Sequence, residues 1–231
     1  VLLSQFHVDH VNDFPALVKG AFFTRRNCDL PVYGPSGNHS VPALPQYLAR
    51  LIGSKGAYAY LSGFLDGGES FRLKPVTVAA DAAHPKVFAA SEGGFRISAV
   101  PVTHSIIPAL GWRGEKDGCA VVFSSSTSNM GRTLDKIAAD ADLLVAHNAI
   151  PEGSTDRVVL KLHMMPSEIG RIAAAAHAKS VVLSHFMNRT ENVMQETAAA
   201  IGSRYKGKLN FARDCDIYAV HSGEQIGSCL R

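Results

Sequence analysis

Short apolar runs separated by polar turns extend along the whole chain and predict alternating strands and helices. Residues 1–4 are apolar up to a polar cluster, which predicts a buried strand leading into a loop. Residues 13–20 carry an early proline and a final glycine, a pattern typical of a helix. Residues 30–37 predict a strand and a Gly/Pro turn, and residues 42–52 have apolar positions at helical spacing. Residues 53–70 are rich in Gly, Ser and aromatic side chains, and we interpret them as a loop or lid.

The middle of the chain has a β pattern, and the rest alternates between helix and strand. The expected strands of the middle part are 71–79, 86–90, 95–102, 109–113 and 119–124. Turns are expected at Glu92-Gly93-Gly94 and at Lys116-Asp117-Gly118. After residue 130 we expect helix 134–139, strand 141–146, helix 167–177, strand 180–184, helix 191–204 and strands 209–212 and 216–220. This order, with no repeat and no linker, favours a layered α/β sandwich.

Length and net charge exclude few protein classes. The 231 residues are 46% hydrophobic, which suits a single domain over residues 1–231. The net charge of +3 is small and spread along the chain, so it disfavours a nucleic-acid partner. No apolar run reaches the ~20 residues of a membrane-spanning helix, so no membrane partner is expected. The chain begins with Val1, so we leave cytoplasmic and periplasmic locations open.

Four cysteines occur without a C-x-x-C pair: Cys28, Cys119, Cys215 and Cys229. We favour free thiols in a reducing compartment. A disulfide such as Cys215–Cys229 is the alternative for an exported protein.

The strongest chemical signal is His7-Val8-Asp9-His10, which places three potential metal ligands within four residues after an apolar run. Imidazole and carboxylate groups suit zinc, iron or manganese. His104 and His185 each end a further apolar strand, where sites form in α/β proteins. One such histidine is usually a core residue, but three strand-end clusters in one chain favour a metal site.

These motifs resemble the metallo-β-lactamase superfamily, in particular its ribonuclease Z, arylsulfatase and phosphodiesterase-like branch. The resemblance extends from residue 1 to about residue 220. The family's first motif is His-x-His-x-Asp-His, and Gln5-Phe6-His7-Val8-Asp9-His10 stands in its place. Further matching segments are Leu-Pro-Val-Tyr-Gly-Pro at 30–35, Pro-Val-Thr-His-Ser at 101–105, Gly-Trp-Arg at 111–113, Ser-Ser-Ser-Thr at 124–127 and Leu-Ser-His-Phe at 183–186.

The resemblance implies a four-layer αββα sandwich. In this family several strands precede the first motif, so we expect that the N-terminal strands are lacking or separated from this chain. They would then belong to a separate or cleaved N-terminal fragment. A homo-oligomer is also expected.

The resemblance also implies the metal ligands. One metal would be held by Asp9, His10 and His185, and a second by His7 and His104. Gln5 stands where the family has a third histidine for the second metal. Ser126 stands where the family has an aspartate that bridges the two metals. Because both substitutions remove good ligands, we expect the first site to be better retained than the second. Zinc is the expected metal, with manganese or iron as alternatives.

A Glu–His pair for proton donation in ribonuclease Z corresponds here to Asn148 and His163. His163 is therefore a candidate general acid, although Asn148 cannot raise its pKa as a carboxylate would. His147, next to Asn148, is expected to support the site from behind the ligands. The Met164-Met165 and Phe22-Phe23 pairs could line a substrate pocket, but such pairs are more often core residues.

Together these features predict a metal-dependent hydrolase that acts on an ester-type bond of a small molecule: a phosphodiester, sulfate ester, carboxylic ester or lactone. Asp9 would orient the attacking water. The alternative is a catalytically impaired member of the fold with a binding or regulatory role, because three substitutions remove charge or ligation. A third interpretation, tRNA processing, is disfavoured, because no segment resembles a long basic exosite or arm.

Overall fold

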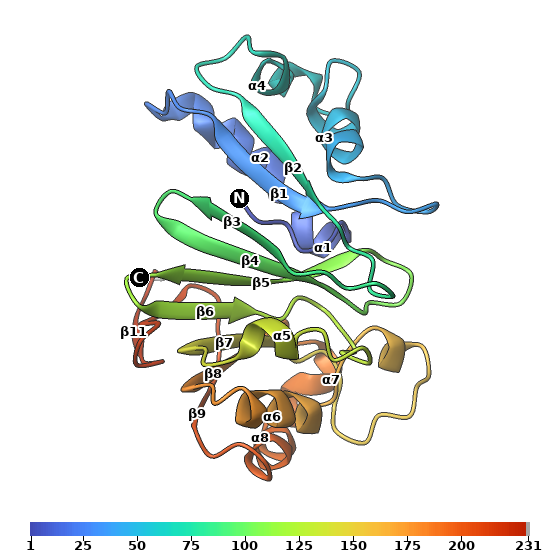
Figure 1. The fold of residues 1–231 in the computed structure, drawn as a ribbon, viewed down its shortest axis with the longest axis vertical. Helices are drawn as coiled ribbons and strands as arrows, with labels where there is room; N and C mark the ends of the chain where they lie inside the picture. The colour runs from blue at the N-terminus through green and yellow to red at the C-terminus, as the bar shows by residue number, and fades with distance from the viewer. Residues whose placement is uncertain (230–231) are drawn as a thin grey trace. The chain divides into compact units, whose positions relative to one another are not determined.

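The computed structural model describes residues 1–229, and the chain divides into two compact units (Figure 1). Unit 1 is Val1–Asp81, and unit 2 begins at Ala82. Each unit has its own cluster of buried apolar side chains. A single domain over residues 1–231 stays a prediction.

Unit 1 combines short helices with one parallel strand pair. Its elements are α1 (Val8–Val11), α2 (Phe14–Gly20), η1 (Ala21–Phe23), β1 (Leu30–Pro35), α3 (Leu44–Ile52), η2 (Ala59–Leu61), α4 (Gly63–Asp66) and β2 (Leu73–Val78). β1 pairs with β2 in parallel. Leu44, Leu48 and Ile52 are fully buried at four-residue spacing, so α3 presents one apolar face to the core.

Two predictions for unit 1 need correction. Residues 1–4 were expected as a strand, but only an isolated parallel bridge between Leu2 and Tyr33 forms. Residues 53–70 were expected as a loop, yet they contain η2 and α4. Leu61 and Phe64, three residues apart, are 0% and 1% exposed. Burial of these two side chains stabilises short helical turns that the Gly and Ser content conceals.

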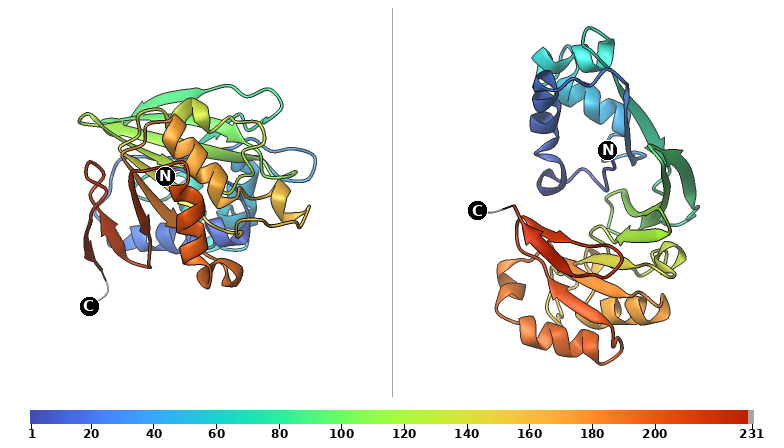
Figure 2. Two further views of the ribbon diagram at one scale, coloured as in Figure 1. Left: turned by 90° about the horizontal axis from the view of Figure 1, so that it is seen from below. Right: turned by 90° about the vertical axis from the view of Figure 1, so that its left-hand side faces the viewer.

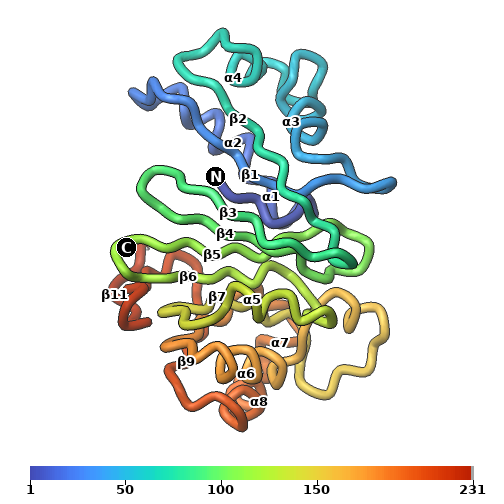
Figure 3. Tube along the Cα trace, viewed as in Figure 1, coloured from blue at the N-terminus to red at the C-terminus, as the bar shows by residue number. Residues whose placement is uncertain are grey.

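Unit 2 is built on a seven-stranded mixed sheet. Its strands are β3 (Phe88–Glu92), β4 (Phe95–Val102), β5 (Ala109–Lys116), β6 (Cys119–Phe123), β7 (Leu143–His147), β8 (Ser180–Ser184) and β9 (Lys208–Phe211). The order of the strands across the sheet is the same as their order in the sequence, and the chain path can be followed in Figure 3. Pairing is antiparallel from β3 to β6 and parallel from β6 to β9. The predicted α/β pattern is therefore observed, with the β-rich part first.

Both predicted hairpin turns are confirmed. Lys116 pairs with Cys119 across Asp117 and Gly118, which have φ angles of 51° and 78°. Positive φ at both central residues is the type I′ geometry that matches strand twist, and glycine adopts it without steric cost. Gly93 and Gly94 form the same kind of turn between β3 and β4.

The helices of unit 2 follow the parallel strands. They are α5 (Asp135–Ala138), η3 (Val159–Lys161), α6 (Pro166–Ala175), α7 (Asn188–Glu191) and α8 (Met194–Gly202). α6 and α8 lie side by side (Figure 2). A single helix was expected over residues 191–204, and its predicted start is wrong. Residue 191 is the last residue of α7, and α8 begins only at Met194. Within residues 1–229, every helix is too short or too polar to span a bilayer.

A small hairpin, β10 (Asp216–Tyr218) with β11 (Gln225–Ser228), contains a disulfide between Cys215 and Cys229. The favoured prediction of free thiols is wrong for this pair, because the hairpin brings the two Cα atoms to 5.0 Å. Cys28 and Cys119 are free.

The contact of α6 with α8 requires a glycine. A Cβ at Gly170 would lie 2.7 Å from the backbone oxygen of Ile201. Gly170→Ala is expected to lower the free energy of unfolding by about 1–3 kcal/mol through overpacking. Gly202, in α8, has nothing within 4 Å of the same position. Gly202→Ala is the matched control, and it should leave stability unchanged or raise it by up to ~1 kcal/mol. Urea unfolding of both variants tests this, and equal stability of the two would contradict the close contact.

Candidate functional site

Four strands of unit 2 run in the same direction and end at the same edge of the sheet. β4 and β6 are both antiparallel to β5, and β6, β7 and β8 are parallel to one another. Side chains that follow these strands therefore meet at one edge. His104 follows β4, Ser126 follows β6, His147 ends β7 and His185 follows β8. The structure thus brings the strand-end residues of unit 2 together.

Backbone conformation is unusual at this edge. Ser105, Ser125 and His185 have φ angles of 53°, 60° and 58°, in the left-handed region. Residues other than glycine adopt this region rarely, and each costs about 1–3 kcal/mol unless its surroundings impose it. Three such residues sit next to the strand ends that carry the candidate site.

The imidazole rings of His104, His147, His163 and His185 form a cluster. The centroid of the His163 ring lies 5.6 Å from that of His104, 5.3 Å from that of His147 and 6.1 Å from that of His185. The rings of His147 and His185 are 6.3 Å apart. His163 therefore lies at the centre of the four, although it comes from the loop after η3 rather than from a strand.

Hydrogen bonds fix both the loop of His163 and the tautomer of His104. Nδ1 of His104 lies 2.8 Å from the backbone oxygen of Leu162, and the amide of Ser105 donates to Lys161 at 2.9 Å. A carbonyl oxygen can only accept, so Nδ1 of His104 carries the proton, and in the neutral ring Nε2 carries the lone pair. A metal-binding histidine has the same arrangement, with one ring nitrogen donating to the protein and the other directed at the ion.

His147 has a similar arrangement. The hydroxyl of Ser124 donates to the Ser125 carbonyl at 2.7 Å, so it accepts from Nδ1 of His147, 3.3 Å away. Nε2 of His147 then carries the lone pair, and it is buried with no hydrogen-bond partner among residues 1–229. A buried polar atom of this kind costs about 1–3 kcal/mol, so an ion or an ordered water is expected to satisfy it.

Burial lowers the pKa of His147 well below its usual value, and the nearby charges of His163, His185 and His104 lower it further. The ring is therefore neutral at physiological pH. A neutral imidazole can act as an acceptor or a metal ligand, whereas an imidazolium cannot.

Ser126 and Asn148, the two altered positions of unit 2, bring no negative charge to this edge. The side chain of Ser126 is 1% exposed. Its neighbours Thr127 and Ser128 both donate to the Thr103 carbonyl, which ties this loop to the end of β4. The Asn148 amide group is buried, with no hydrogen-bond partner in the described part of the chain.

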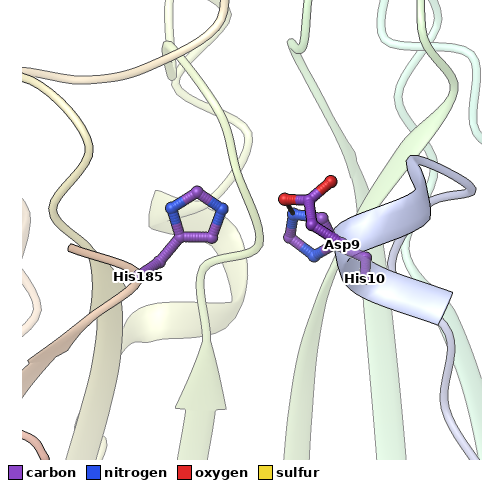
Figure 4. Close-up of side chains that lie close together, drawn as sticks. All are labelled: Asp9, His10 and His185. Carbon is purple, nitrogen blue, oxygen red and sulfur yellow. Dashed lines mark ion pairs between the residues drawn. The ribbon is translucent and has the colours of Figure 1, made fainter. Parts of the chain in front are cut away.

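The candidate residues of unit 1 lie at the start of α1 rather than in the expected open loop. His7 is the N-cap of α1, and its carbonyl accepts from the amide of His10 at 3.0 Å. Nε2 of His10 lies 3.5 Å from the Asp9 carboxylate. Figure 4 shows this pair on α1, and also the His185 ring on the segment after β8. Gln5 is fully buried, and neither polar atom of its amide has a hydrogen-bond partner among residues 1–229.

Each unit therefore presents donors that fit a first-row transition metal. Unit 2 provides His104 and His147, whose tautomers are set by hydrogen bonds to the protein. Unit 1 provides two imidazoles and the Asp9 carboxylate. Nitrogen and oxygen donors of this kind are taken by zinc, manganese and iron.

A polar network that was not predicted from the sequence supports the loop after Ser126. Arg171 donates to Asp135 at 2.8 and 3.0 Å and to Glu168 at 2.7 and 2.8 Å. The amide of Asn129 donates to Glu168 at 2.9 Å and to Asp135 at 3.3 Å. The three-residue spacing of Glu168 and Arg171 on a predicted helix was a readable signal. The contribution of Asn129 had no sequence signal.

A cleft of about 360 Å³ opens beside His163. Met164, Met165, Asn129 and Glu168 contribute to its lining. Met164 also belongs to the buried core, so the methionine pair has both of the roles considered from the sequence. His163 is itself one of the residues that line this cleft.

Comparison with known proteins supports the family resemblance that the sequence motifs indicated. The chain matches the family described as Beta-lactamase superfamily domain over residues 1–186. Ribonuclease Z from Mycobacterium bovis (strain BCG / Pasteur 1173P2) is 25% identical over 234 residues, covering 96% of this chain and 79% of that protein. A putative ribonuclease Z from Mycobacterium tuberculosis (strain CDC 1551 / Oshkosh) is 24% identical, covering 96% of this chain and 99% of that protein.

Solved structures show the same fold. The metallo-beta-lactamase fold protein YhfI from Bacillus subtilis has a TM-score of 0.66 at 20% identity, covering 92% of this chain and 74% of that one. Human tRNase Z, short form, has a TM-score of 0.65 at 18% identity, covering 95% of this chain and 78% of that one. The predicted fold class is confirmed.

These relatives correct one prediction. A small-molecule substrate was expected from the site residues and a nucleic-acid partner was thought unlikely from the weak net charge, but similar proteins include ribonuclease Z and tRNase Z. The expectation is therefore wrong. Net charge averages over the whole chain, so it does not report a local surface that could bind RNA.

The network at Asp135 leads to a pH-dependent prediction. Burial raises the pKa of Asp135, but hydrogen bonds from Arg171 and Asn129 outweigh it, and the pKa lies below its usual value. Its contribution to stability is therefore present above the unfolded pKa of about 3.9 and is lost as the pH falls through the folded value. Asp135→Asn should lower the free energy of unfolding by about 1–2 kcal/mol at pH 7 and by less at pH 3.

Denaturant unfolding at the two pH values measures this difference. Asp140→Asn is the control, because the side chain of Asp140 is 84% exposed and should contribute little at either pH. An Asp135→Asn effect of the same size at both pH values would argue against a charge-dependent network.

Proposed function

The chain belongs to the β-lactamase superfamily and is a metallo-β-lactamase-fold hydrolase of the ribonuclease Z-like branch, and we propose that it hydrolyses phosphodiester bonds in RNA. The observation that carries this proposal is the cluster of His104, His147, His163 and His185 at one sheet edge. The ribonuclease relatives support RNA as the substrate class.

We propose that Asp9, His10 and His185 hold one metal ion and that His7 and His104 contribute to a second, weaker site. The tautomer of His104 supports this assignment, because its Nε2 carries the lone pair. Zinc is the proposed metal, with manganese or iron as alternatives. When bound, the metal supplies Lewis acidity and a hydroxide nucleophile at neutral pH.

The remaining roles are to orient the attacking water and to donate a proton to the leaving oxygen. Asp9 is proposed to orient the attacking water. His163 is proposed to protonate the leaving oxygen, and its position at the cleft supports that role. His147 stays neutral and packs against the His163 ring, so it would hold that ring in place without competing for the proton.

Proton donation by His163 can be tested through the leaving group. With an RNA substrate, whose leaving alkoxide needs a proton, His163→Ala should lower kcat by about 10²–10⁴-fold. With bis(p-nitrophenyl) phosphate, whose leaving group departs without a proton, the loss should be much smaller. The readouts are gel-based cleavage of a tRNA transcript and release of p-nitrophenolate.

His177→Ala is the matched control, because the side chain of His177 is 82% exposed. Equal losses on both substrates would contradict a general-acid role for His163 and would indicate a purely structural one.

The alternative function is a binding protein with an impaired site. Gln5, Ser126 and Asn148 favour it, because each replaces a ligand or a charge of the family pattern with a neutral group. Loss of a bridging carboxylate removes a full negative charge between two cations, which weakens the binding of the second cation. This reading predicts metal binding below two equivalents and no turnover.

Restoring the ligands separates the two readings. Gln5→His combined with Ser126→Asp is expected to raise the metal content of the purified chain toward two equivalents. Elemental analysis of freshly purified wild type, this double variant and His185→Ala measures it, with phosphodiesterase activity assayed in parallel. Turnover by the wild type supports the hydrolase. Turnover by the double variant alone establishes the impaired protein.

A further inference from the structure

Three aromatic rings of unit 1 surround the ammonium group of Lys19. Its Nζ lies 4.9 Å from the centroid of the Phe22 ring, 5.2 Å from that of Phe23 and 6.0 Å from that of Tyr60. These are cation–π distances, and they bring residues of α2, η1 and η2 together. The predicted Phe22-Phe23 pair is therefore part of a larger group.

The rings of this group remain exposed. The side chain of Phe23 is 82% exposed and that of Tyr60 is 61% exposed. Phe22 is anchored, because its ring packs edge-on against buried Phe64 at 5.0 Å. Clustered exposed aromatics mark interaction surfaces, whereas single ones need no explanation. We name Lys19, Phe22, Phe23, Arg25 and Tyr60 the aromatic–basic surface.

The charge of this part of the chain is one-sided. Between Phe14 and Leu65 there are five basic residues (Lys19, Arg25, Arg26, Arg50 and Lys55) and one acidic residue, Asp29. Asp29 is already paired with Lys74 at 3.2 Å. Arg26 donates to the Asp29 carbonyl, whereas Arg25, two residues after Phe23 in the chain, is exposed. Asp13 and Asp66 border this stretch, so the basic excess is confined to residues 14–65.

We propose that the aromatic–basic surface binds a single-stranded segment of RNA. Bases would stack on the exposed rings of Phe23 and Tyr60, and Lys19 and Arg25 would contact phosphates. Exposed aromatics interleaved with cations are the pattern of single-strand binding surfaces. A protein partner is disfavoured, since the cores of protein interfaces are depleted in lysine. The proposal rests on RNA being the substrate.

The test is fluorescence anisotropy of the full chain with a labelled 12-nucleotide oligouridylate at several salt concentrations. Phe23→Ala should weaken binding about 5- to 10-fold with an unchanged salt slope, because stacking is uncharged. Lys19→Gln and Arg25→Gln should each reduce the slope of log K against log salt by about 0.7, the value for one phosphate contact on single strands.

Unit 2 offers a matched control pair. Lys116 lies 4.9 Å from the ring of Phe95, which is 45% exposed, but no second ring joins them among the described contacts. Phe95→Ala and Lys116→Gln should change the affinity less than twofold and leave the salt slope unchanged. Thermal unfolding of all variants confirms that each is folded.

The outcomes distinguish this proposal from the proposed function. Unchanged binding and slope in the Phe23, Lys19 and Arg25 variants, with RNA cleavage intact, overturn the surface and leave the function standing. Weakened binding in these variants, with no RNA or phosphodiester turnover by the wild type, supports the surface and overturns the function. A dimer that Phe23→Ala dissociates while RNA affinity stays constant, measured by light scattering, identifies a self-association face and overturns the proposal.

Discussion

The common direction of β4, β6, β7 and β8 is the constraint on which the candidate site depends. Side chains alternate between the two faces of a strand, so a one-residue slip in the pairing would move every side chain, including the residues at the strand ends, to the opposite face of the sheet. In β7 and β8, Leu144 pairs with Val181 and His147 with Ser184. Both apolar residues are buried. The packing that stabilises unit 2 therefore also fixes the position of His147 and of His185 directly after β8.

The close approach of four imidazole rings disfavours the charged form of each ring. Several imidazolium ions this close would repel one another, and burial increases that cost. Burial first, and the neighbouring imidazoles second, lower the pKa of His147 well below its usual value. With Ser126 and Asn148 in place of carboxylates, no nearby side chain at those positions compensates positive charge. A neutral His147 ring with a lone pair on Nε2 is the state that remains, and a cation is a ligand that this lone pair satisfies well.

Much of this arrangement was readable from the sequence, and the failures have physical reasons. Strand-end histidines His104 and His185 and both glycine turns followed from local patterns. Helical turns at η2 and α4 did not, because they depend on burial of Leu61 and Phe64 against distant residues. The disulfide of Cys215 likewise depends on how two strands pair. The central position of His163 needed the hydrogen bond from His104 to Leu162, which no local pattern encodes.

Charge was the least informative property of the sequence, for a reason that applies beyond this chain. The whole chain has 23 basic and 20 acidic residues, a balance that neither requires nor excludes an anionic partner. Within about a Debye length of ~10 Å, however, a ligand experiences only nearby charges. The stretch from Phe14 to Leu65, with five basic residues and one acidic residue, presents a different field from the average. In the proposed function, recognition of RNA would depend on the placement of a few cations beside exposed rings, whereas its cleavage would depend on the histidine cluster of unit 2, so the two properties could change independently.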